Sequence, residues 1–339
     1  MLKGLKQCII NACIAAPTFI WNPATVILEK KTSKEYLEQL QLERYGRYLE
    51  KHFDIEWERA VKNRKLMVIT QGPYSFSYWN VSAANNMVSL IIYSLYHGCI
   101  PTIRINHNRS DYFSWDWYFL QPYEVMGTDI SNFEEVECPV SCCSMCSNMQ
   151  IVHEPRSWKF RLFQMLFQRF LVLNQSTQAY VDEEIKILGN CDKMLGVLMR
   201  GTDYIKLKPA GHPVQPSPNE IIQKVRECFD QGQYSAVYVA TEEKKLFDLV
   251  GEAIGVDHIR QNKRQYYDMQ FYSNNEDLIG RVSFDRENDN YWKGIEYLSS
   301  LIILSRCHSL VAGNCGGTMF AVLMGNYSQP YIFNYGVYQ

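Results

Sequence analysis

Short apolar runs alternate with longer helical patterns along most of this chain. In the second half, such runs stand at residues 194–199, 236–240 and 309–312, and each precedes a segment with helical spacing of apolar residues. A short continuous apolar run is typical of a strand that is buried on both faces of a parallel sheet. Because parallel strands need a crossover connection, the alternation predicts a doubly wound α/β sheet.

The first half repeats this pattern on a smaller scale. Apolar runs at 65–70 and 100–105 enclose a helical pattern over 80–97, which predicts a βαβ unit. Residues 156–190 are predicted to form a long helical stretch that connects the two halves. The sequence therefore predicts an α/β fold with two Rossmann-like domains that face a cleft. The predicted parts are a helical extension over 1–64, an α/β domain with the connector over 65–190, and a second Rossmann-like domain over 191–339.

Composition favours a globular protein and excludes one class of partner. Hydrophobic residues make up 47% of the 339 residues and charged residues 21%, as in ordinary globular chains. The 34 lysines and arginines are balanced by 36 acidic residues, for a net charge of -2. Since no broad positive field results, we expect no nucleic acid partner, and any anionic ligand must be held by a local site.

The N-terminal segment, Met1 to Trp21, carries two lysines and an apolar stretch that is interrupted by Asn11 and Pro17. It lacks a tidy cleavage site for a secretory signal and is too short to span a bilayer. We therefore expect a cytoplasmic protein with reduced cysteines. Its N-terminus would make a peripheral contact with the inner face of the membrane, or would form a packed helix.

Four cysteines, at positions 138, 142, 143 and 146, form the densest cluster of thiols. Zinc sites usually pair two C-x2-C knuckles, whereas this cluster has one such spacing with irregular neighbours. We expect reduced thiols here and no metal. The chain also has no obvious D-x-D sequence, which argues against a sugar-nucleotide site that depends on a divalent metal.

Polar residues follow three of the predicted strands in the second half. Arg200 to Asp203 follow the first, Thr241 and Glu242 the second, and the glycine-rich turn 313–318 the third. In open α/β sheets, ligands bind at this carboxyl edge, where helix N-termini favour anions. The glycine-rich turn matches neither the P-loop nor G-x-G-x-x-G. The three segments together describe a nucleoside diphosphate pocket; alternatively, Arg200 and Asp203 form a salt bridge in a plain turn.

A segment dense in aromatic residues follows the predicted strand 100–105. It runs from Asn106 to Pro122 and includes Trp115 and Trp117. Aromatic rings commonly line sugar pockets, so the segment is interpreted as facing the cleft on the acceptor side, together with Asn80. The alternative interpretation is that these rings close the core of the first domain.

The order of these parts resembles the fucosyltransferases of the GT-B architecture that use GDP-fucose, including the α-1,6 enzymes of N-glycan cores and nodulation factors. The family sequence H-V-R-R-T-D is similar to Leu198–Asp203, and the family strand end A-T-D-D is similar to Ala240–Glu243. Weaker matches lie at Trp79-Asn80, Asn85, Trp115–Pro122 and Leu298–Thr318, so the resemblance covers about residues 65 to 335. It implies GDP-fucose as donor substrate, a glycan acceptor and no further cofactor.

The resemblance also implies roles for individual residues. Arg200 matches the arginine that contacts the donor diphosphate, and Asp203 matches the aspartate expected to orient that arginine; both are the predicted catalytic residues. Glu296 resembles the acidic residue that holds guanine. The other predicted donor contacts are Thr241 and Glu242 near the nucleotide, and Gly316, Gly317 and Thr318 at the phosphate oxygens.

Three positions depart from the family pattern: Leu198 replaces its histidine, Gly201 its second arginine, and Lys208 a candidate carboxylate base. Asp203 and His212 are the remaining candidates for a general base. The implied activity is inverting, metal-independent transfer of fucose in surface polysaccharide synthesis. A GT-B transferase with another sugar nucleotide and a non-catalytic nucleotide-binding module are the alternatives.

Overall fold

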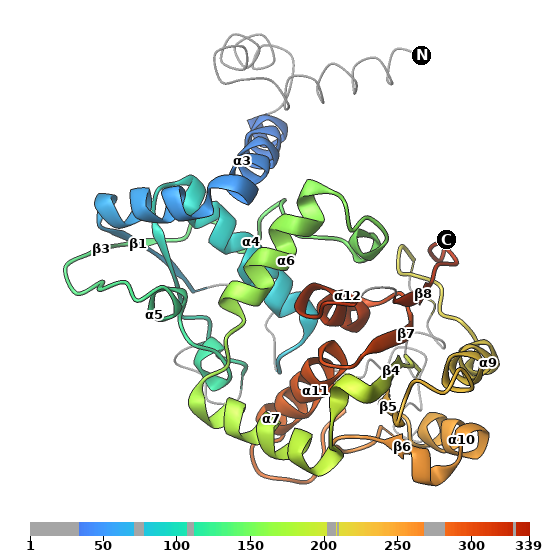
Figure 1. The fold of residues 1–339 in the computed structure, drawn as a ribbon. Helices are drawn as coiled ribbons and strands as arrows, with labels where there is room; N and C mark the ends of the chain where they lie inside the picture. Colours follow the sequence, from blue (N-terminus) through green and yellow to red (C-terminus); the bar gives the residue numbers. More distant parts are fainter. Residues whose placement is uncertain are drawn as a thin grey trace, which may run out of the picture.

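The computed structural model describes residues 34–70, 78–106, 112–201, 208, 210–267, 282–327 and 330–339. Helices surround two separate parallel sheets, which confirms the α/β class (Figure 1). The predicted membrane contact at the N-terminus and the catalytic Asp203 lie outside the described residues. Within the described part, no helix has the combination of length and apolar character that crossing a membrane requires.

The first half contains a three-stranded sheet with the order β2-β1-β3, in which both pairings are parallel. Its elements are α3 (Lys34–Asn63), β1 (Lys65–Ile69), α4 (Val81–Tyr96), β2 (Ile100–Ile103) and β3 (Glu134–Glu137). The predicted βαβ unit is confirmed as β1-α4-β2. The strand β3 was not predicted, because its sequence E-E-V-E is largely exposed and has no apolar run.

The connector between the sheets consists of two helices within the predicted helical stretch 156–190. They are α6 (Trp158–Phe170) and α7 (Gln175–Leu188). The second helix starts at an N-cap, where the side chain of Asn174 accepts a hydrogen bond of 3.0 Å from Thr177 N. Leu173 just before it forms an isolated bridge with Phe119, which takes the chain out of helical geometry.

The second half forms a five-stranded, fully parallel sheet with the order β6-β5-β4-β7-β8. The predicted alternation of strands and helices is confirmed throughout. The elements are β4 (Met194–Leu198), α9 (Pro218–Phe229), β5 (Ala236–Ala240), α10 (Lys244–Ile254), β6 (Ile259–Arg260), α11 (Asp289–Ser305), β7 (Ser309–Gly313), α12 (Gly316–Met324) and β8 (Tyr331–Phe333).

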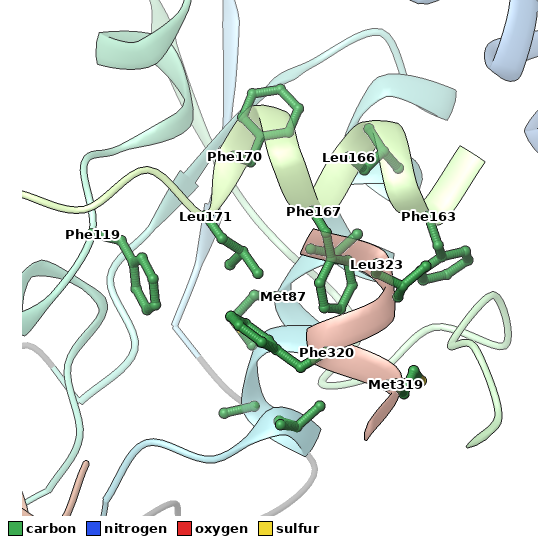
Figure 2. Close-up of a cluster of buried hydrophobic side chains, with 14 of the residues drawn as sticks. Met87, Phe119, Phe163, Leu166, Phe167, Phe170, Leu171, Met319, Phe320 and Leu323 are labelled. Atoms are coloured by element: carbon green, nitrogen blue, oxygen red, sulfur yellow. The ribbon is translucent and has the colours of Figure 1, made fainter. Parts of the chain in front are cut away.

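The two halves share one hydrophobic core, in which α12 contacts helices of both halves. Figure 2 shows Phe320 of α12 among side chains from α4 and α6, including Met87 and Phe167. The rings of Phe167 and Phe320 lie 6.1 Å apart, and both are fully buried. This core fixes the start of α12 relative to the first half. The domain boundaries at 64/65 and 190/191 stay a prediction.

Candidate functional site

The strand order of the second sheet changes direction between the neighbouring strands β4 and β7. From β4 it proceeds through β5 to β6 on one side, and then crosses to β7 and β8 on the other. Leu198 at the end of β4 is in register with Ala240 of β5 and with Ala312 of β7. The loops that follow these three strands therefore meet at a topological switch point, the place where open α/β sheets bind ligands.

Arg200 leaves β4 at this point and pairs with Glu242, which leaves β5. Its Nη1 lies 3.3 Å from Glu242 Oε1, and the two side chains are 18% and 8% exposed. The same carboxylate oxygen accepts a hydrogen bond of 3.1 Å from Gly201 N. Glu242 thus holds both the guanidinium and the start of its loop, a positioning role for which the sequence offered Asp203.

Gly201 is packed tightly against the beginning of α10. A Cβ atom added there would collide with the carboxylate of Glu243 and would lie 3.0 Å from Leu246 Cδ1. A larger residue at position 201 would therefore have to displace the carboxylate of Glu243.

Two threonines predicted to contact the donor are buried, with their hydroxyls engaged by nearby backbone. Thr241 Oγ1 accepts a hydrogen bond of 3.3 Å from Glu243 N. Thr318 Oγ1 donates a hydrogen bond of 2.5 Å to Gly313 O. These bonds stabilise the shape of the loops after β5 and β7, and the predicted donor contacts of both residues stay predictions.

The first turn of α12 begins just after β7 ends, at the edge of the sheet where the Arg200 loop also begins. The side chain of its N-cap, Cys315, does not bind the first backbone N–H groups, and Cys315 Sγ instead lies 3.4 Å from Thr318 Oγ1. A Cβ atom added to Gly316 would lie 3.5 Å from Cβ of Val81, the first residue of α4. The positive ends of two helix dipoles therefore approach one another at the edge of the sheet where β4 and β7 end, an arrangement that attracts an anion.

Tyr297 of α11 belongs to this site, although nothing in the sequence singled it out. A Cβ atom added to Gly317 would lie 3.1 Å from the Tyr297 hydroxyl, which places that hydroxyl at the first turn of α12. Burial raises the pKa of Tyr297, and the charge of Arg200 lowers it by a smaller amount. The hydroxyl is therefore protonated and available as a donor at neutral pH.

Gln215, which precedes α9, contacts Asn314 in the loop between β7 and α12. Gln215 Nε2 donates a hydrogen bond of 2.7 Å to Asn314 O, so the proline-rich loop covers this turn. Asn314 is buried, and its Oδ1 has no hydrogen-bond partner among the described residues, while its Nδ2 lies 3.4 Å from His153 Nε2. Burial lowers the pKa of His153, so this ring is neutral at pH 7.

Glu296 lies on α11 in a separate network of charges. Arg286 Nη1 lies 2.5 Å from Glu296 Oε1, and Gln265 N donates a hydrogen bond of 3.2 Å to Glu296 Oε2. Both carboxylate oxygens are thus engaged within the protein. A guanine contact would have to replace one of these bonds, and it stays a prediction.

The three residues predicted on the acceptor side have different environments. Asn80 caps α4 by accepting a hydrogen bond of 3.0 Å from Ala83 N. Trp115 is fully buried and donates through Nε1 to Leu120 O at 2.8 Å. It belongs to the core, as the alternative interpretation had it, and offers no surface to an acceptor. Trp117 is partly exposed and contacts Tyr291 at the start of α11.

The candidate base His212 lies where the proline-rich loop pairs with the C-terminal residues. Its carbonyl accepts a hydrogen bond of 2.9 Å from Tyr338 N, and the next residue, Pro213, forms a bridge with Val337. Over the described ranges, no group of three or more His, Cys, Asp or Glu side chains is arranged to hold a metal ion.

No protein-family model matches this chain, and no curated protein matches it in sequence. Among solved structures it is similar to fucosyltransferase NodZ from Bradyrhizobium, at 12% identity and a TM-score of 0.42 over 77% of this chain and 93% of that chain. An Arabidopsis thaliana FUT1 mutant in complex with GDP has 11% identity and a TM-score of 0.44 over 89% and 80% of the chains. POFUT1 in complex with GDP-fucose has 10% identity and a TM-score of 0.35 over 85% and 78%. At this identity and with TM-scores below 0.5, the likeness by itself establishes neither the activity nor the ligand of this chain.

Proposed function

We propose that the chain is a glycosyltransferase that transfers fucose from GDP-fucose to a glycan acceptor, with inversion and without a metal. One observation carries the proposal. Arg200 follows β4 and the first turn of α12 follows β7, and these two strands are parallel neighbours at the switch point of the sheet. A guanidinium and free N–H groups at one sheet edge fit a diphosphate, which is the leaving group of an activated sugar.

The proposed reaction is a single displacement. The acceptor oxygen forms a bond to the anomeric carbon while the bond from that carbon to the diphosphate oxygen breaks, and GDP leaves with the electron pair. Arg200 and the N–H groups of α12 stabilise the charge that develops on GDP, and the Tyr297 hydroxyl is placed to donate a further hydrogen bond. A general base takes the acceptor proton.

The remaining assignments belong to the same proposal. We assign the base to Asp203, with His212 as the alternative, and the other donor contacts to Thr241, Glu242, Glu296, Gly316, Gly317 and Thr318. The choice of fucose rests on the similarity of Leu198–Asp203 and Ala240–Glu243 to the family sequences. We further propose that the acceptor belongs to surface polysaccharide synthesis and that Met1 to Trp21 contact the membrane.

Calorimetric titration with GDP, GDP-fucose, UDP and UDP-glucose, in buffer with a chelator, tests this proposal. We expect GDP and GDP-fucose to bind with micromolar affinity, equivalent to about -8 kcal/mol, and both uridine nucleotides to bind at least tenfold more weakly. Equal affinity for UDP-glucose would refute the choice of donor. If none of the four nucleotides bound, the transferase proposal would be refuted.

A further inference from the structure

A cavity of about 610 Å³ lies at the N-terminal end of α11. It is lined by Trp117, which ends the short helix η1 (Trp115–Trp117), by Ser283, and by the run 288–292 that leads into α11 and forms its first turn. Its volume falls within the range of pockets that bind small organic ligands. The donor site does not use any of these residues.

Three aromatic rings form the walls of this cavity. Tyr291 lies between the two tryptophans, 5.7 Å from Trp117 at an interplanar angle of 66° and 5.5 Å from Trp292 at 85°. Trp292 is 38% exposed, an unusual position for so large a side chain. Rings that stand nearly perpendicular to one another present flat faces in different directions, which suits a ligand with apolar C–H faces.

The described polar groups that line the cavity can form hydrogen bonds and carry almost no net charge. Asn288 adopts a left-handed conformation with φ of 55° and does not cap α11, and its side-chain amide makes no hydrogen bond to the described residues. The carboxylate of Asp289 is neutralised by Arg286 at 2.7 Å and by Lys293 at 3.4 Å. Among the described residues, the lining therefore offers amide and hydroxyl groups and includes no cation that would select an anion.

The helix α11 connects this cavity with the donor site. Tyr291 lines the cavity, and Tyr297 on the same helix places its hydroxyl at the first turn of α12. Six residues of α-helix separate these positions by about 9 Å along the helix axis. This separation is of the order of one or two sugar rings.

We propose that this cavity binds a neutral saccharide and holds the acceptor of the proposed fucosyl transfer. Pyranose rings stack their C–H faces on aromatic rings, and amide side chains bind their hydroxyl groups. The stacking surface is provided by Trp117, Tyr291 and Trp292, and hydrogen bonds by Asn288 and Ser283. The acceptor role rests on the proposed function, whereas saccharide binding does not.

Titration of the full chain with neutral disaccharides, followed by the tryptophan indole N–H signals in NMR spectra, tests the proposal. The probes are cellobiose, lactose, maltose, mannobiose and diacetylchitobiose, with diglucuronic acid as the charged comparison. We expect at least one neutral disaccharide to bind with Kd near 1 mM. Trp292→Ala should weaken binding at least tenfold. Tyr48→Ala, which removes a ring that is 44% exposed on the distant α3, should leave it unchanged.

The same samples are titrated with GDP, which separates the two proposals. GDP binding without saccharide binding, or equal saccharide affinity of the Trp292→Ala and native proteins, would overturn the cavity proposal alone. Tighter binding of diglucuronic acid than of every neutral disaccharide would also overturn it. Saccharide binding at Trp292 without GDP binding would refute the acceptor role and the proposed function, and would leave a carbohydrate-binding site.

Discussion

The two glycines that begin α12 provide a matched pair of substitutions. A Cβ atom at Gly317 would lie 3.1 Å from the Tyr297 hydroxyl and 3.2 Å from both Leu198 Cδ2 and Leu301 Cδ2. A Cβ atom at Gly316 would meet Val81 alone, at 3.5 and 3.7 Å, which is ordinary van der Waals contact. Both glycines lie in the same helical turn, so the two alanine variants differ chiefly in the space available.

We expect Gly317→Ala to lower the free energy of unfolding relative to Gly316→Ala by about 1–3 kcal/mol. That is the typical cost of an extra carbon in a filled interior. The gain of up to about 1 kcal/mol from replacing glycine by alanine in a helix applies to both variants and largely cancels. The cost arises because the new methyl group would lie too close to Leu198 of β4 and to Tyr297 and Leu301 of α11.

Urea denaturation of both variants, followed by far-UV circular dichroism, measures the difference directly. Gly316→Ala should be as stable as the native protein or slightly more stable. If Gly317→Ala proves equally stable, the first turn of α12 does not pack against Leu198 and Tyr297 as described. The position of the helix end in the donor site would then be wrong.

Three further outcomes follow from the structure. Phe320→Ala should destabilise the protein by about 3–5 kcal/mol, because the ring lies in the core shared by both halves. Unfolding should remain a single transition by fluorescence and by circular dichroism. Two separate transitions would contradict the shared core. Glu296→Gln should lower the free energy of unfolding by about 1–3 kcal/mol, because Arg286 loses a charged partner. A loss of GDP binding at unchanged stability would instead favour a contact between Glu296 and guanine. Cys142→Ser should remove one fast-reacting thiol in a labelling assay at pH 8, whereas Cys143→Ser should remove none. Burial raises the pKa of Cys143 to about 12, so the thiol form persists at every pH well below that value.

The strands and helices of the second half were predictable because each core strand is a short apolar run and each helix has a clear apolar period. The edge strand β3 was not predicted, because E-E-V-E joins the sheet through backbone pairing with β1 while most of its side chains are exposed and polar. The break between α6 and α7 was marked only by the N-cap residue Asn174, a weak signal within a long helical pattern.

The site was predictable in outline and not in detail. Periodicity and chain order place Arg200, Thr241 and the glycine-rich turn at one sheet edge, because parallel strands end together. They do not specify that Glu242 pairs with Arg200, or that Tyr297 reaches Gly317 from the middle of α11. The sequence also does not distinguish Trp115 from Trp117. Both lie in one short helix, but Trp115 is fully buried and Trp117 is partly exposed, a difference that depends on the tertiary fold.

The most direct test of the donor site is a calorimetric titration of GDP into the native protein and into Arg200→Ala, Arg200→Lys and Arg306→Ala. Arg306 precedes β7 at the opposite edge of the sheet, so its variant controls for the loss of a positive charge. We predict micromolar GDP binding, a loss of about 2 kcal/mol or more in Arg200→Ala, a smaller loss in Arg200→Lys and no change in Arg306→Ala. Native GDP affinity in Arg200→Ala, with the fold intact, would contradict a diphosphate site at the end of β4.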